Sequence, residues 1–151
     1  MPIISIITPC YNHELFLDEM FNSIELHLYP DLFEHIIIDD GSTDEYTKQK
    51  IIELSEKGSI VIEQENKGLG AARNAGIEKS VGKYIQPLDS DNKIISNVFL
   101  QALSYLDRNI DTCAVYTDAI YFGERNGIWK TGDLEYFSML GGNSIDACAL
   151  I

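Results

Sequence analysis

Residues 33–44 read FEHIIIDDGSTD, a mostly apolar run that ends in two acidic residues and a Gly-Ser turn. A short apolar run bounded by turn residues is typical of a strand covered on both faces. Ser42 and Glu45 have the spacing of a capping box, so we expect a helix to follow toward Lys57-Gly58. This strand–turn–helix unit sets the pattern for the rest of the chain.

The same alternation extends in both directions. Strand-like runs are expected at residues 3–7, 59–63, 83–87 and 112–117, and helical spacing of apolar residues at 17–28, 68–79 and 95–106, with Pro30 closing the first helical region. Repeated strand–helix units predict a Rossmann-like α/β fold, with a mostly parallel central sheet and helices on both faces. After Asp118 the pattern changes to a small hairpin (119–122 with 127–130), a short helix at 133–140 and the start of a strand at 146–151.

Length and composition set the domain organisation. The 151 residues are 45% hydrophobic and 23% charged, which suits one globular domain covering residues 1–151. Because the sequence stops inside an apolar run, we expect it to be the truncated N-terminal part of a longer protein.

The charge balance restricts the partners. The chain has 11 basic and 24 acidic residues, which give a net charge of −13. This charge disfavours binding to nucleic acids or anionic membranes over a broad surface. No apolar stretch approaches the roughly 20 residues of a membrane span, and the N-terminus lacks the basic start of a signal peptide. Cys10, Cys113 and Cys148 form no zinc or disulfide pattern. We therefore expect a cytoplasmic protein, with peripheral attachment to the inner face of the membrane as the alternative.

Polar residues gather at the predicted strand ends. Ligands of open parallel sheets bind beyond the carboxyl ends of the strands. Those ends carry Thr8-Pro9-Cys10-Tyr11-Asn12, Asp39-Asp40-Gly41-Ser42, Asn66-Lys67-Gly68 and Asp89-Ser90-Asp91. The sequence thus predicts a ligand site at this edge of the sheet.

Two familiar phosphate motifs do not fit. Residues 68–73 begin like GxGxxG but place Arg73 at the last glycine and follow the third strand, not the first. Residues 76–83 resemble a Walker A loop with one residue too many, and Tyr84 replaces its Ser or Thr. NAD enzymes and P-loop NTPases are poor interpretations.

Asp89-Ser90-Asp91 is the sharpest local feature. Carboxylates two residues apart can serve one metal and one ligand, and hard oxygen ligands suit Mg²⁺ or Mn²⁺, which can bridge a diphosphate. The alternative is a solvated turn.

Several neighbours of this motif have two interpretations each. One of Asp39 and Asp40 could accept a hydrogen bond from a nucleoside, or both could simply cap a helix. Tyr11 could stack on a base or be a loop aromatic, and Arg73 could balance phosphate charge or be solvated. The three histidines do not have the spacing of a metal site. We therefore interpret each of them as a surface residue or as a residue whose ring nitrogens are hydrogen-bonded within the protein.

Taken in order, these motifs resemble the family 2 glycosyltransferases with the GT-A fold. The matching segments are Thr8-Pro9-x-Tyr11-Asn12, Asp39-Asp40-Gly41-Ser42-Thr43-Asp44, Asn66-x-Gly68-x-x-x-Ala72-Arg73-Asn74-x-Gly76 and Leu88-Asp89-Ser90-Asp91. Each is weak alone, but four in order over nearly the whole chain are specific.

The resemblance implies a site for a nucleotide-diphospho-sugar, most often a UDP-sugar. Thr8, Pro9 and Tyr11 would line the nucleoside pocket, and Asp39 would contact the uracil, with Asp40 beside it. Gly68 and Arg73 would belong to the donor-side wall, Asp89 would lie by the ribose and sugar, and Asp91 would ligate Mn²⁺ or Mg²⁺. The family reaction passes the sugar to an acceptor hydroxyl, usually with inversion, and the metal stabilises the leaving diphosphate.

The catalytic base of that family lies in a later segment, so we expect it beyond Ile151. This departure leaves two alternatives open: a non-catalytic module that binds a nucleotide-sugar or glycan, and, ranked last, a nucleotidyltransferase. The latter would want glycine and basic residues after the first strand, which residues 8–13 lack. The acceptor, a glycan or a lipid-linked glycan, and the oligomeric state are not specified by the sequence.

Overall fold

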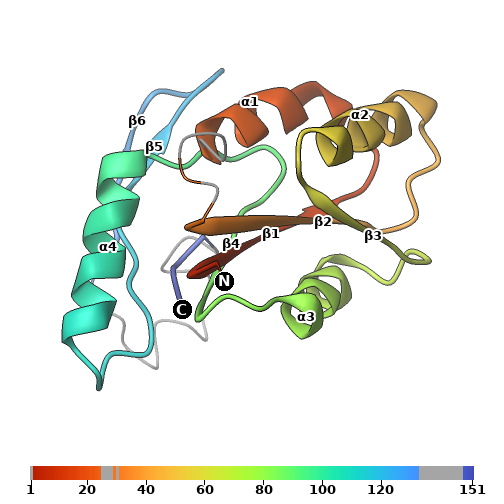
Figure 1. Cartoon of the computed structure of the whole chain (residues 1–151). Coiled ribbons are helices and arrows are strands. Elements are labelled where there is room, and N and C mark those ends of the chain that lie inside the picture. Colours follow the sequence, from red (N-terminus) through yellow and green to blue (C-terminus); the bar gives the residue numbers. More distant parts are fainter. Residues whose placement is uncertain (1, 25–28, 30, 133–147) are drawn as a thin grey trace.

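The main sheet has four parallel strands in the order β3-β2-β1-β4 (Figure 1). The computed structural model describes residues 2–24, 29, 31–132 and 148–151. In chain order the elements are β1 (Ile4–Cys10), α1 (Glu14–Ile24), β2 (Phe33–Asp39), α2 (Glu45–Glu56), β3 (Ile60–Glu63), α3 (Leu69–Lys79), β4 (Tyr84–Pro87), α4 (Ser96–Arg108), β5 (Ala119–Tyr121) and β6 (Gly127–Trp129). The predicted α/β architecture is confirmed.

β1 lies inside the sheet, and all of its residues are buried. Its pairing with β4 ends at Ile7, which lies opposite Pro87, whereas its pairing with β2 continues to Cys10. Pro9 lies in this extension, beyond the pairing with β4. The absence of an N–H on Pro9 therefore costs the sheet no hydrogen bond to β4. The end of β1 therefore projects past β4, with one edge open where the site forms.

Helices cover both faces of the sheet, as the apolar strands require. In Figure 1, α1 and α2 lie on one face and α3 on the other. Because successive strand residues point to opposite faces, Ile6 packs toward α1, α2 and α4 while Ile7 packs with Ile36, Ile38 and Ala72 of α3.

Gly76 sets how closely α3 approaches the sheet. A Cβ there would lie 2.5 Å from a methyl carbon of Ile7 and 2.7 Å from one of Ile38. Glycine is thus required by close packing at a position where the helix backbone meets two strands.

The predicted strand over residues 112–117 is wrong. In the described part of the chain this segment makes a single antiparallel bridge, from Val115 to Leu150, with two backbone hydrogen bonds of 2.8 and 2.9 Å. Ile151 in turn exchanges backbone hydrogen bonds with Ile85 of β4. A β-strand needs a partner strand that pairs with it over several residues. Among the described residues, this segment has only one paired residue.

The predicted cap of α2 is also wrong in detail. The N-cap is Asp44, whose side chain accepts a hydrogen bond from the Thr47 backbone amide at 2.7 Å. Ser42 instead accepts one from the backbone amide of Asn12 at 3.1 Å. Both residue types suit an N-cap. The Ser42 hydroxyl is engaged by the Asn12 amide, and the Asp44 carboxylate is the group that accepts from the first turn of α2.

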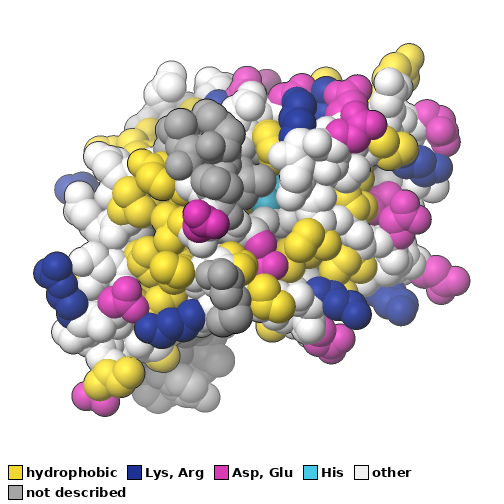
Figure 2. All heavy atoms as spheres, viewed as in Figure 1, with side chains coloured by type: hydrophobic (Ala, Val, Ile, Leu, Met, Phe, Trp, Pro, Cys, Tyr) yellow, Lys and Arg dark blue, Asp and Glu magenta, His cyan; other side chains and the backbone are white. Residues whose placement is uncertain are grey.

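The last part of the chain forms the predicted hairpin, with β5 and β6 antiparallel. The helix expected at 133–140, and residues 25–28 of the first predicted helix, lie outside the described residues. Among the helices that are described, none is both long enough and apolar enough to cross a membrane. Figure 2 shows hydrophobic side chains gathered over the face that carries α4 and the hairpin, where Ile95, Ile120 and Ile128 are exposed.

Candidate functional site

A pocket of about 370 Å³ opens where β1 and β4 end. Its walls come from the loops after β1, β2 and β4 and from the start of α3. It is lined by Pro9, Cys10, Tyr11, His13, Asp40, Asn66, Gly68, Leu69, Ala72, Asp89, Ser90 and Asp91. The convergence of strand ends expected from the sequence is therefore observed.

Asp40 holds one wall of this pocket together. Its Oδ1 accepts hydrogen bonds from Gln64 Nε2 at 2.6 Å and from the Lys67 amide at 2.9 Å, and its Oδ2 accepts one from the Gly68 amide at 2.8 Å. Burial of Asp40 opposes ionisation, but these hydrogen bonds and the charge of Lys67 outweigh it, so the pKa of Asp40 is lowered. Asp40 therefore stays charged and fixes the loop that begins α3.

Asp39 and Gly41 close the same wall from behind. Asp39 Oδ1 accepts a hydrogen bond from the Ser42 amide at 2.8 Å, and the side chain is not among those lining the pocket. Gly41 has φ of +77°, and a Cβ on it would lie 2.8 Å from the Asn66 backbone nitrogen. The turn after β2 thus packs directly on the loop that precedes α3.

Asn12 ties the loop after β1 to the loop after β2. It has φ of +51°, in the left-handed region that Asn tolerates better than most residues. Its Oδ1 accepts from the Thr43 and Asp44 amides at 2.8 and 3.0 Å, and its Nδ2 donates to the Thr43 hydroxyl at 3.2 Å. These hydrogen bonds hold the loop that carries Tyr11, a residue that is 49% exposed and lies at the mouth of the pocket.

The acidic turn after β4 forms the opposite wall. Asp89 Oδ1 accepts a hydrogen bond from Arg73 Nη2 at 2.5 Å, an ion pair in which both side chains are about a quarter to a third exposed (24% and 30%). Arg73 Nε is buried and has no hydrogen-bond partner among the described residues. Asp91 is exposed and makes no hydrogen bond or ion pair with any described residue. Of the two carboxylates, Asp91 is the one that has neither oxygen engaged by a described residue.

Thr8 lies elsewhere. Its side chain is fully buried, and its hydroxyl meets His35 Nε2 at 3.0 Å and Met20 Sδ at 3.7 Å. His35 Nδ1 meets the Ser59 hydroxyl at 2.8 Å, and burial lowers the pKa of His35 to about 3. A neutral imidazole with Nε2–H donating to Thr8 and Nδ1 accepting from Ser59 satisfies all three groups.

The structure thus brings together six of the residues predicted for the site: Pro9, Tyr11, Asp40, Gly68, Asp89 and Asp91. Thr8, Asp39 and Arg73 do not line the pocket. Asp39 and Arg73 support its walls from behind, and Thr8 lies in the core. Six lining residues were not among those predicted for the site: Cys10, His13, Asn66, Leu69, Ala72 and Ser90. Of these, His13 and Leu69 also lie outside the residues named in the strand-end and family motifs. The position of His13 directly after Tyr11-Asn12 was the available signal, whereas nothing in the sequence marks Leu69, which is exposed at the first turn of α3.

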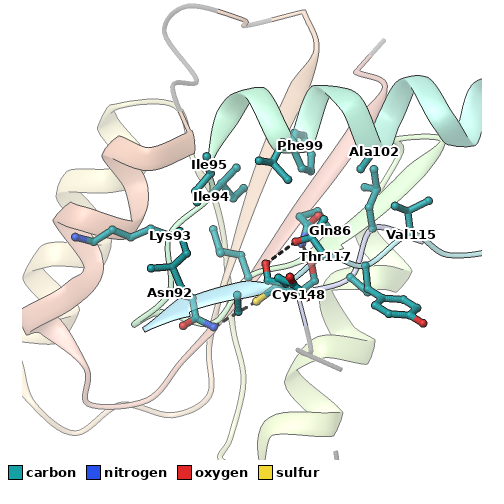
Figure 3. A pocket seen from close by; sticks show the side chains of 18 of the residues that line it. Gln86, Asn92, Lys93, Ile94, Ile95, Phe99, Ala102, Val115, Thr117 and Cys148 are labelled. Atoms are coloured by element: carbon teal, nitrogen blue, oxygen red, sulfur yellow. Dashed lines mark hydrogen bonds between the residues drawn. The ribbon is translucent and has the colours of Figure 1, made fainter. Parts of the chain in front are cut away.

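A second, larger pocket of about 520 Å³ lies between α4, the hairpin and residues 148–150 (Figure 3). Its lining is mainly apolar. Gln86 Nε2 donates to the backbone oxygen of Cys148 at 2.5 Å, and Lys93, the cation among its lining residues, pairs with Glu19. A mainly apolar lining suits an anionic ligand poorly, whereas the smaller pocket carries Asp91, a carboxylate that could hold a divalent cation against a diphosphate.

The described residues do not form a complete metal site by themselves. No group of three or more His, Cys, Asp or Glu side chains gathers there in a way that could hold a metal ion. A Mg²⁺-type ion commonly takes one or two carboxylates and completes its shell with phosphate oxygens and water. Asp91, with free oxygens at the pocket, fits that donor set.

Comparisons with known proteins point in one direction. The family model described as Glycosyl transferase family 2 matches residues 5–147. A glycosyltransferase of Haemophilus influenzae is 34% identical over 148 residues, which cover 95% of this chain and 59% of the relative. Glycosyltransferase GlyA of Streptococcus pneumoniae is 32% identical over 91% of this chain and 19% of the relative. The crystal structure of S. aureus TarS 1-349 in complex with UDP superposes with a TM-score of 0.69 at 26% identity, over 84% of this chain and 38% of that one. The chain therefore spans only part of the length of the proteins it matches.

Proposed function

The chain belongs to glycosyl transferase family 2 and has the GT-A fold, and we propose on this basis that it binds the nucleotide-diphospho-sugar donor of a glycosyltransferase. The observation that carries the proposal is the pocket at the strand ends, where Tyr11, Asp40 and the Asp89–Asp91 turn meet. We also propose that residues 1–151 form one domain.

The nucleoside half of the donor is assigned to the mouth of the pocket. Tyr11 offers a half-exposed ring on which a base can stack. Both oxygens of Asp40 are engaged by the protein, so Asp40 shapes the pocket. Asp39 uses Oδ1 for the Ser42 amide, and its Oδ2 makes no hydrogen bond to a described residue, so Asp39 is the carboxylate assigned to the uracil. We propose a uridine nucleotide, supported by the UDP complex of the S. aureus TarS structure.

The diphosphate half is assigned to the acidic turn, which Arg73 supports from behind through Asp89. A net charge of −13 makes an unassisted diphosphate site unfavourable. Asp91 would hold Mn²⁺ or Mg²⁺, which supplies positive charge to the leaving diphosphate when bound. Arg73 pairs with Asp89. We propose that the carboxylate held in this way lies by the ribose and sugar of the donor.

The reaction proposed for the whole protein is transfer of the sugar to an acceptor hydroxyl, with inversion at the anomeric carbon. An inverting transfer needs a base opposite the leaving group to take the acceptor proton. We assign no residue of this chain to that role. A glycan or lipid-linked glycan as acceptor and a cytoplasmic location remain part of the proposal.

A panel of nucleotides tests the donor assignment. Thermal shifts of the chain are measured with UDP, GDP, CDP and ADP, each with Mn²⁺. We expect UDP to stabilise the chain most, and Tyr11→Ala to reduce that shift. Tyr46→Ala is the matched control, because Tyr46 is 76% exposed on α2 and does not line the pocket. No stabilisation of the folded chain by any of the four would contradict the proposal.

Turnover separates an enzyme from a binding module. Release of UDP from UDP-sugars is measured with the chain and with any longer form of the protein that contains it. Metal-dependent release supports the transferase. Tight UDP binding with no release or transfer by the longer form would favour a non-catalytic module, and pyrophosphate release from a nucleoside triphosphate and a sugar phosphate would indicate a nucleotidyltransferase.

A further inference from the structure

The ring of His13 reaches across the pocket to the acidic turn after β4. His13 Nδ1 lies 2.6 Å from the hydroxyl oxygen of Ser90, 77 residues later in the chain. Ser90 is only 6% exposed, and both residues line the pocket. The contact is therefore a short side-chain hydrogen bond between two loops that carry site residues.

The neighbours of this pair hold the ring in place. The His13 ring packs edge-on against Phe16 of α1, with 5.3 Å between ring centroids. The preceding residue, Asn12, is held to the loop after β2 by two hydrogen bonds from backbone amides. A ring supported in this way has little rotamer freedom left to lose, so its hydrogen bond to Ser90 is preorganised.

Ser90 is the central residue of the Asp89–Asp91 turn. Asp89 is held by Arg73, but Asp91 has no partner among the described residues. A restraint on the Ser90 side chain thus acts on the backbone from which the Asp91 carboxylate projects.

We propose that His13 is a positioning residue of the donor site: its Nδ1 holds the Ser90 hydroxyl and so fixes the turn that presents Asp91 to the pocket. The role assigned to Asp91 rests on the proposed function, whereas the restraint of the turn by His13 does not. His13 itself need not touch the donor. Its effect is to reduce the ordering that the turn would otherwise undergo when ligand binds.

Because the contact is made by Nδ1 and not by Nε2, substitutions of His13 that place a polar group at one or the other position test the proposal. An Asn side chain places its polar end near the position of Nδ1, whereas Gln reaches toward that of Nε2. We expect His13→Asn to retain most of the restraint, and His13→Gln, His13→Ala and Ser90→Ala to lose it. Ser55→Ala, at an exposed serine on α2, is the matched control.

Two readouts are measured on the whole chain, after urea unfolding has confirmed that each variant is folded. The first is amide hydrogen exchange of residues 89–92 without ligand, and the second is the dissociation constant for UDP with Mn²⁺. Loss of one hydrogen bond predicts about a 3- to 10-fold change in each. The double variant His13→Ala/Ser90→Ala should be no worse than either single one, because both remove the same interaction.

The proposal is overturned if amide exchange at 89–92 is unchanged in His13→Ala, if Asn and Ala at residue 13 behave alike, or if the two single effects add. If the wild-type chain binds no UDP, the proposed function fails, yet amide exchange still decides whether His13 restrains the turn. Failure of one can therefore be told from failure of the other.

Discussion

The carboxylate of Asp40 accepts a hydrogen bond from the backbone amide of Gly68, with Oδ2 and the nitrogen 2.8 Å apart. This bond joins the end of β2 to the first turn of α3, and Gln64 and the Lys67 amide bind the other oxygen. One buried charge thus shapes the wall of the pocket along residues 64–68.

Replacement of Asp40 by Asn should lower the free energy of unfolding by about 1–3 kcal/mol, because the amide group turns an N–H toward donors that need an acceptor. Urea unfolding at neutral pH measures this, with Glu65→Gln, an exposed acid on the same loop, as control. The lowered pKa of Asp40 means that its stabilisation is complete above the ordinary Asp pKa of 3.8 and is lost as pH falls through the lowered value. Wild type and Asp40→Asn should therefore converge in acid; an equal difference at all pH values would contradict this role.

Asn12 should show an unusual order of substitutions. Ala at residue 12 loses the three side-chain hydrogen bonds to Thr43 and Asp44 and also carries the strain of a left-handed φ, about 1–2 kcal/mol. Gly loses the hydrogen bonds without the strain, and Asp keeps the two bonds to backbone amides. We expect stability to fall in the order Asn, Asp, Gly, Ala, measured by urea unfolding. An Ala variant more stable than the Gly variant would show that this conformation is not enforced.

The two glycines of α3 should respond in opposite directions to alanine. Gly76→Ala forces a methyl group against Ile7 and Ile38 and should destabilise the chain by about 1–3 kcal/mol. Gly70→Ala adds a methyl group in open space in the first turn and should stabilise it by up to about 1 kcal/mol. Thermal unfolding of the two variants, measured side by side with the wild-type chain, tests this prediction. Equal changes in stability for the two variants would contradict the packing of α3 on the sheet.

The strands of the parallel sheet were predictable because each is a short apolar run ended by turn residues, as in β2. The segment 112–117 also has a strand-like local pattern but is no strand in the described structure, since pairing depends on a partner that a local pattern does not reveal. The placement of Thr8 was equally hidden: alternation along β1 turns its side chain into the core beside His35, while Pro9 lines the pocket. The position of His13 after Tyr11-Asn12 indicated that it could reach the site, but its contact with Ser90, 77 residues later, could not be predicted from local sequence.

His35 should make the chain less stable in mild acid. Burial lowers the pKa of His35 to about 3 in the folded chain, whereas the unfolded chain titrates near 6.5. The unfolded state therefore binds more protons between these values, and stability falls as pH drops from 6.5 toward 3, by at most about 1.4 kcal/mol per pH unit. In His35→Gln this component should disappear from urea unfolding curves recorded between pH 4.5 and 7. An unchanged slope in that variant would argue against a buried neutral imidazole.

Calorimetric titration of UDP into the chain, with and without Mn²⁺ and with Asp91→Ala, tests the donor site most directly. Asp111→Ala is the control, because Asp111 is also an exposed acid but does not line the pocket. We predict binding that Mn²⁺ strengthens, with that gain reduced roughly 10-fold or more in Asp91→Ala and retained in Asp111→Ala. A folded chain that binds no UDP in either condition, or an Asp91→Ala variant that keeps the full effect of Mn²⁺, would contradict the account.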